Sequence, residues 1–153
     1  MSESARICDQ LRRAHCGEAW HGPSVREVLA GVSAAQASRR AIGGAHSIWE
    51  IVLHIAAWEE AARKALDGAT MPTLPWEGDW PPVGDTSPAA WNDAQAHLES
   101  TQKELEKGVE KFPNVRLSEK VAGRDYSFYF LLHGVVQHTL YHAGQIALLK
   151  KAA

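Results

Sequence analysis

Apolar residues recur every three or four positions in four long stretches of the chain, and no stretch alternates between apolar and polar residues over a useful length. Such a spacing places apolar side chains on one face of an α-helix. Two shorter helices are also predicted, because Gly22-Pro23 leads into residues 25–29 and Ser33 to Gln36 has the form of a capping box. The four long helices are predicted over residues 3–18, 46–67, 88–111 and 127–150.

Capping residues mark the start of the two central long helices. Ser47 and Glu50 have the serine-to-glutamate spacing of a second capping box. Ser87 precedes Pro88, which gives an N-cap followed by proline at the first helical position. Residues 114–126 contain a glycine turn signal, so we expect a turn there with a short hairpin around it.

The segment between the second and third long helices is rich in proline and tryptophan. No helix or central strand tolerates that density of proline. The preceding helix, of about 22 residues, would be about 33 Å long, and an extended loop of this length can span it from end to end. We therefore expect an all-α fold, a four-helix bundle with a long crossover between helices two and three, rather than a simple up-down-up-down bundle. The residues concerned are Pro72, Pro75, Trp76, Trp80, Pro81 and Pro82.

Composition narrows the class of protein. The 153 residues are expected to form one domain, 1–153, and the formal net charge of −2 without a strongly basic stretch argues against nucleic-acid binding. The chain has no apolar run of about 18 residues and no secretory signal pattern, so we expect a cytoplasmic protein without a membrane span. Cys8 and Cys16 would lie roughly 12 Å apart along one helix, too far to form a disulfide.

His138 and His142 are the strongest candidates for chemistry. They lie four residues apart on the apolar stripe of the last predicted helix, so both imidazoles can converge on one metal ion. A shared ion would satisfy two buried rings that otherwise need separate polar partners. His54 occupies an interior position of the second long helix and completes a set of three. Three neutral ligands with an open position are typical of a catalytic metal site, whereas the alternative is a set of hydrogen-bonded core histidines.

The remaining histidines separate from this set. His97 flanks the apolar stripe of the third helix and is the only realistic substitute ligand. His46 lies about 12 Å from His54 along the helix axis. His15 and His21, near the end of the first helix, are expected to be solvated.

His133 lies about 140° around the last helix from His138, so it cannot bind the same ion. With Gln137 and Tyr141 it forms a side face that is expected to meet a second subunit.

Three further residues lie close enough to support the histidines. Glu50 lies one helical turn before His54 and could accept a hydrogen bond from it, although helix capping is the simpler explanation. Tyr141 and Gln145 flank the histidine pair and could face the open coordination side, although helix packing also explains their positions.

Three sequence blocks span nearly the whole chain: Trp20-His-Gly-Pro-Ser24, His46-Ser-Ile-Trp-Glu-Ile-Val-Leu-His-Ile-Ala-Ala-Trp58 and Gln137-His-Thr-Leu-Tyr-His-Ala-Gly-Gln-Ile146. The chain resembles, in these blocks, the DinB-like (DinB/YfiT) superfamily of metal-binding four-helix bundles. The block that ends in Tyr-His-Ala-Gly-Gln-Ile is the most specific.

The resemblance implies an up-down-down-up bundle and a three-histidine site for a divalent metal ion, zinc or nickel. By motif, the ligands fall on His54, His138 and His142. The resemblance also implies a homodimer, and some relatives are transferases or isomerases that use a low-molecular-weight thiol as cosubstrate.

Two functions follow from these expectations. The first is a metal-dependent enzyme that activates a low-molecular-weight thiol or water against a small-molecule substrate, as a thiol transferase or a hydrolase would. The alternative is a non-catalytic, stress-linked dimeric module in which the metal is structural. An apolar-pocket protein without metal remains a third possibility, in which both histidines of the last helix are ordinary core residues.

Overall fold

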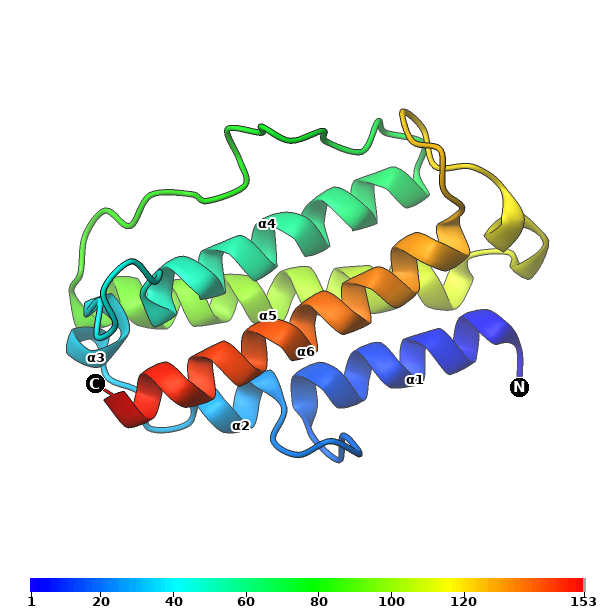
Figure 1. Cartoon of the computed structure of the whole chain (residues 1–153). Coiled ribbons are helices and arrows are strands. Elements are labelled where there is room, and N and C mark those ends of the chain that lie inside the picture. The colour runs from blue at the N-terminus through cyan, green and yellow to red at the C-terminus, as the bar shows by residue number, and fades with distance from the viewer. Residues whose placement is uncertain (153) are drawn as a thin grey trace.

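The computed structural model describes residues 1–152, in which helices and loops make up the fold (Figure 1). Within that range the only β-type pairing is an isolated antiparallel bridge between Lys120 and Ser127, which is all that forms of the expected hairpin. The elements are α1 (Glu3–Cys16), α2 (Val25–Leu29), α3 (Ala34–Ser38), α4 (Ile48–Leu66), α5 (Pro88–Lys111), the 3-10 helix η1 (Asn114–Ser118) and α6 (Phe128–Ala152).

Serine caps begin five of these helices. In each case the serine side chain accepts a hydrogen bond from a backbone N–H three residues later, which stabilises a helix by about 1 kcal/mol. The capping boxes predicted at Ser33 and Ser47 are confirmed, and Ser24 with Glu27 forms a third. The helices therefore start where local sequence chemistry directs them.

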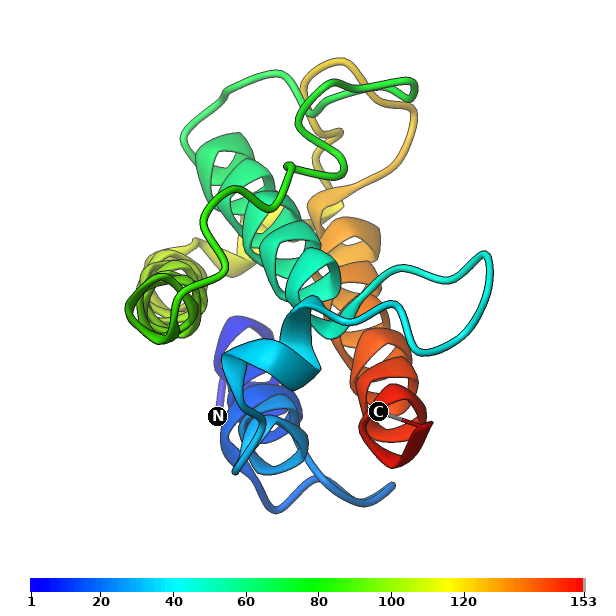
Figure 2. The same cartoon turned by 90° about the vertical axis from the view of Figure 1, so that its left-hand side faces the viewer.

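The four long helices surround a common core, as the end-on view shows (Figure 2). The starts of α4 and α5 pack with the end of α6 around Ile48, Trp91 and Ile146. Their opposite ends pack with the starts of α1 and α6 around Leu66 and Val109. The helices α4 and α5 thus run in the same direction, and α1 and α6 run against them, as the length of the connecting loop predicts (Figure 1).

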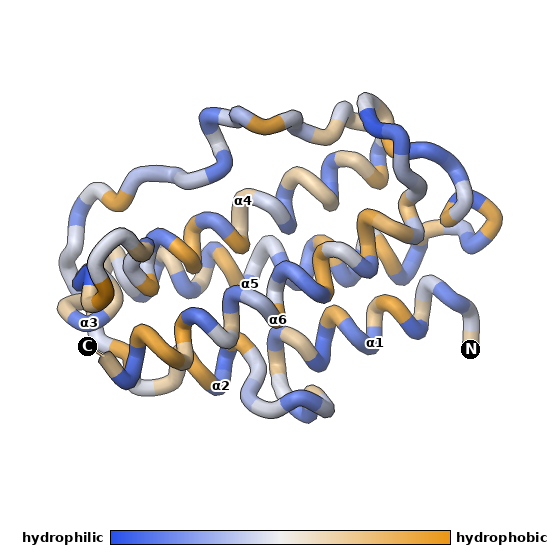
Figure 3. Tube along the Cα trace, viewed as in Figure 1, coloured by the Kyte–Doolittle hydropathy of each residue, from blue (hydrophilic) through white to orange (hydrophobic). Residues whose placement is uncertain are grey.

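The connection from α4 to α5 returns along the outside of α4 for the length of the bundle (Figure 1). Apolar residues are spread along all four long helices and are sparse in this connection (Figure 3). Trp76 and Trp80 nevertheless turn inward and are half-buried. The crossover is therefore anchored to the bundle by its tryptophans.

One sequence expectation about the core is wrong. His15 is only 4% exposed, although it lies in the last turn of α1, where we expected it to be solvated. The short helix α2 folds back against α1, and Val25 and Leu29 line a pocket together with the His15 side chain. Burial lowers the pKa of His15 to about 4, so this histidine is neutral at pH 7.

Among residues 1–152, no helix combines the length and the apolar character that crossing a membrane requires.

Candidate metal centre

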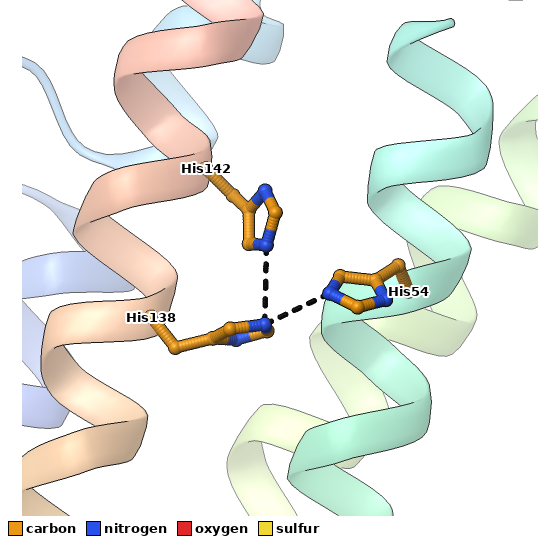
Figure 4. A group of neighbouring side chains, drawn as sticks. All are labelled: His54, His138 and His142. Atoms are coloured by element: carbon orange, nitrogen blue, oxygen red, sulfur yellow. Dashed lines mark hydrogen bonds between the residues drawn. The ribbon is translucent and has the colours of Figure 1, made fainter. Parts of the chain in front are cut away.

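His54 from the middle of α4 faces His138 and His142, one turn apart on α6, across the core (Figure 4). The Nε2 atom of His138 lies 2.9 Å from Nε2 of His54 and 3.1 Å from Nε2 of His142. His54 and His142 are buried and His138 is half-buried. One ring nitrogen from each residue lies within 4.8 Å of the others, so the three form a group that could hold a metal ion.

The outer nitrogens of two rings are held by oxygen atoms. His54 Nδ1 lies 2.6 Å from the backbone carbonyl oxygen of Asp79, and His142 Nδ1 lies 2.6 Å from Oε1 of Gln145. Because carbonyl oxygens only accept hydrogen bonds, both Nδ1 atoms carry the proton and donate it. The lone pairs of both Nε2 atoms are therefore directed toward His138, which is the tautomer that a metal ligand needs.

Counting protons shows that the three rings suit a cation. With His54 and His142 protonated at Nδ1, their Nε2 atoms can only accept. His138 has at most one proton on Nε2, so it can donate to only one neighbour, and the other close N···N contact is left without a hydrogen bond and is repulsive. A positive ion among the three nitrogens would turn this repulsion into attraction.

The protein environment keeps the three imidazoles neutral. Burial, helped by the nearby His142 and His54, lowers the pKa of His138 to about 3. Burial also lowers the pKa of His142, to about 4, and that of His54, where the contact with Asp79 opposes it. Neutral imidazole is the form that coordinates metal ions, so no proton must be removed at pH 7.

The crossover supplies contacts that the sequence did not reveal. Trp80 stacks on the His54 ring with centroids 3.9 Å apart, and its other face stacks on His46 at 3.5 Å. One residue earlier, the Asp79 carboxylate accepts a hydrogen bond from Trp58 Nε1 at 2.7 Å. These contacts fix the loop segment whose carbonyl binds His54. The unusual density of tryptophan was the only sequence signal for them.

The predicted supporting residues differ in what they contact. Gln145 accepts the hydrogen bond from His142, whereas Tyr141 is 65% exposed and places its ring edge-on to His142 at 5.1 Å. The Glu50 carboxylate accepts from the Ser47 amide and pairs with Arg40, and no hydrogen bond joins it to His54 in the part of the chain described.

The other histidines lie outside the group, as the sequence indicates. His97 is exposed on α5, and His133 packs against Tyr129 with ring centroids 4.4 Å apart. The substitute ligand considered from the sequence is therefore not part of the cluster.

Two pockets flank the histidine cluster. One, of about 350 Å³, is lined by Trp80, Tyr141, His142 and Gln145 among others. The second, of about 240 Å³, lies between α6, Trp58 of α4 and Met71 of the crossover, and His138 forms part of its wall. A molecule in either pocket would contact one of the three histidines.

The chain belongs to the DinB superfamily, since the sequence profile of that family matches residues 19–146. That stretch includes α2 to α5 and most of α6, and with them all three histidines of the cluster. Comparisons with curated proteins and with solved structures gave no match.

Proposed function

We propose that the protein binds one divalent metal ion, zinc or nickel, through His54, His138 and His142, and that it is a metal-dependent enzyme. It activates a low-molecular-weight thiol or water for attack on a small electrophilic substrate. The observation that carries this proposal is the convergence of three Nε2 atoms, two of them in rings whose Nδ1 protons are already engaged. A divalent ion with three neutral ligands keeps its full charge and lowers the pKa of a bound thiol or water.

The residues around the histidines have three roles in this proposal. The Asp79 carbonyl and Gln145 hold the Nδ1 protons, which orients two ligand rings before any ion arrives. Trp80 covers one face of His54 and keeps water from it. Tyr141 and Gln145 line the pocket beside His142, where a substrate can approach the open coordination position.

The nucleophile in this proposal comes from the cosubstrate. Cys8 is buried in α1 with its Sγ directed at the Glu106 carbonyl oxygen, and burial raises the pKa of this thiol. Such a thiol is a poor source of thiolate at pH 7. Cys16, at the end of the same helix, is absent from the lining of both pockets beside the histidines.

The alternative function, a non-catalytic module with a structural metal, has less support. A structural zinc site normally has four protein ligands. In residues 1–152 the group contains three, and the candidate fourth ligand, His97, is exposed on α5.

We also propose that the protein forms a homodimer through the outer face of α6. Tyr141 and Leu148 are each at least 64% exposed, and their spacing of seven residues places them on one face of the helix with Gln137. A row of exposed apolar side chains on one helix is typical of a surface that a second subunit covers.

Metal analysis tests the site directly. We expect one zinc or nickel ion per chain in protein purified without a chelating resin. His54→Ala, His138→Ala and His142→Ala should each lose most of that metal, because each removes one of three ligands. His97→Ala is the matched control, since it removes an exposed histidine outside the cluster. Retention of stoichiometric metal by any of the three cluster variants would contradict the assignment.

Thiol dependence tests the chemistry. Activity against a panel of electrophiles and esters should require both the metal and an added low-molecular-weight thiol, and metal should restore chelated protein. The double variant Cys8→Ser/Cys16→Ser should keep its turnover. Metal-dependent turnover without a thiol would assign hydrolysis, and a fully metal-loaded protein without turnover would favour the non-catalytic module.

A further inference from the structure

The pocket beside His138 is lined almost entirely by apolar side chains. Apart from His138, the residues that line it are aromatic, aliphatic or glycine, and none carries a formal charge. Met71 from the crossover and Leu131 from α6 are buried at its base, and Phe130, 64% exposed, lies at its rim. The aromatic residues of the wall are Trp58, Tyr126 and Phe130.

The size of the pocket sets the size of its occupant. Its volume is about 240 Å³. A cavity of about 150 Å³ lined by apolar side chains accommodates benzene. The pocket therefore has room for one six-membered ring with a short substituent, and its aromatic walls suit a flat apolar ring.

The charge of the pocket sets the charge of its occupant. Moving an ionised group from water into apolar surroundings without a partner is costly, and the lining offers no cation to offset a carboxylate or sulfonate. Arg124 lies over the Tyr126 ring, 6.0 Å from its centroid, but is not part of the wall. A neutral ring is favoured over an anionic one of equal size.

We infer that this pocket binds a neutral, apolar ring of the substrate and presents it beside the histidine cluster. This inference rests on the proposed function, since it names the class of small molecule on which the metal site acts. His138 belongs both to the pocket wall and to the cluster, so a short polar substituent on the ring would lie beside the place where chemistry is proposed.

Gly134 determines how much of the pocket is open. A Cβ atom at this position would meet no heavy atom within 4 Å, so a side chain there would occupy free space. Side chains on a helix lean toward its N-terminus, so a leucine at 134 would cover the turn that contains Phe130 and Leu131. It would occupy part of the pocket and leave His138, one turn toward the C-terminus, uncovered.

Binding of benzyl alcohol and of benzoate to the full chain tests the inference. The two probes have similar size and differ in charge. The shift of the Trp58 indole N–H signal in nuclear magnetic resonance spectra reports occupancy, and chelator-treated protein is used so that benzoate cannot bind to a metal ion. We expect benzyl alcohol to bind about tenfold more tightly than benzoate.

Glycine substitutions then locate the binding site. Gly134→Leu should weaken benzyl alcohol binding by about tenfold or more, because the leucine side chain takes up volume that the ring needs. Gly144→Leu is the matched control: it also replaces an α6 glycine with open space around its Cβ position, and it lies outside the pocket. Both substitutions favour helix formation, so both variants should fold.

Zinc affinity, measured on the same variants, separates this inference from the proposed function. Gly134→Leu should bind zinc as the unmodified chain does. Equal binding of the two probes, or equal benzyl alcohol affinity in the Gly134→Leu and Gly144→Leu variants, would overturn the pocket assignment while zinc binding stands. Absence of zinc binding by the unmodified chain would overturn the metal site. The ring-binding result would still stand, because it is measured on chelator-treated protein.

Discussion

Replacing Glu59 by glutamine removes a carboxyl group from the middle of the bundle. Glu59 lies in α4 and is 1% exposed. The hydroxyl of Thr101 on α5 is 3.2 Å from Glu59 Oε2 and 2.9 Å from the carbonyl oxygen of Leu98. That hydroxyl has one proton, and the carbonyl at the shorter distance can only accept it. A protonated Glu59 satisfies the remaining contact by donating, so the arrangement favours a neutral carboxyl.

The pKa of Glu59 gives the size of the effect. Burial, together with the nearby Glu106 charge, raises the pKa of Glu59 from 4.5 to about 8. From pH 4.5 upward the unfolded chain releases the Glu59 proton while the folded chain keeps it. The free energy of unfolding therefore falls as pH rises, by about 1.4 kcal/mol per unit, until the folded carboxyl also ionises near pH 8. Between pH 4.5 and 7 the loss amounts to about 3 kcal/mol.

Glutamine removes this loss, because its amide is neutral at every pH and can donate to Thr101 as the protonated carboxyl does. We expect the stability of Glu59→Gln, relative to the unmodified chain, to increase by about 3 kcal/mol from pH 4.5 to 7 and to level off above pH 8. Urea unfolding at a series of pH values, with chelator present, measures this difference.

Glu60→Gln is the matched control for the Glu59 experiment. Glu60 is the next residue of α4, and its side chain is 46% exposed and paired with Lys64. The free energy of unfolding of the Glu60→Gln variant should change with pH as that of the unmodified chain does. If the free energy of unfolding of Glu59→Gln changed with pH in parallel with that of the unmodified chain, Glu59 would be ionised in the folded state, and the neutral carboxyl inferred from its contact with Thr101 would be refuted.

Two further predictions concern the site and the assembly. Gln145→Leu should weaken zinc binding by about 10- to 100-fold, as measured by competition with a chelator, because the His142 Nδ1 proton loses its acceptor. Gln10→Leu, on the exposed surface of α1, should leave zinc binding unchanged. Light scattering at micromolar concentration should give twice the chain mass of 16.8 kDa. Leu148→Asp should halve the measured mass, whereas Val115→Asp, also at an exposed position, should leave it unchanged. A monomeric mass for the unmodified chain would refute the dimer.

The helices and the histidine group were predictable because both depend on local spacing. Serine caps and apolar periodicity are properties of a few consecutive residues, and the pair His138 and His142 is brought together by one helix. His54 needed only an interior position on a facing helix. The burial of His15 was missed because it depends on how α2 folds back, which no local pattern specifies.

The contacts of the crossover were beyond sequence reasoning for a related physical reason. Asp79 acts on His54 through its backbone carbonyl, and any residue provides that atom, so the residue type gave no signal. Proline density shows that a segment is extended but does not fix which part of it lies against the helix. Trp80 is placed by stacking between His46, which precedes α4, and His54, eight residues later within α4, and the three rings meet only in the folded state.

The topology and the candidate metal centre are therefore linked through one segment. Parallel α4 and α5 require a connection that runs the length of the bundle, and this connection passes along α4 on the side of His54 (Figure 1). A short turn between antiparallel helices would leave the His54 Nδ1 proton without the Asp79 carbonyl and the ring without Trp80. The same long loop that lets α4 and α5 run parallel thus selects the His54 tautomer that can bind a metal ion. Deletions that shorten the loop should accordingly weaken metal binding even when all three histidines are kept.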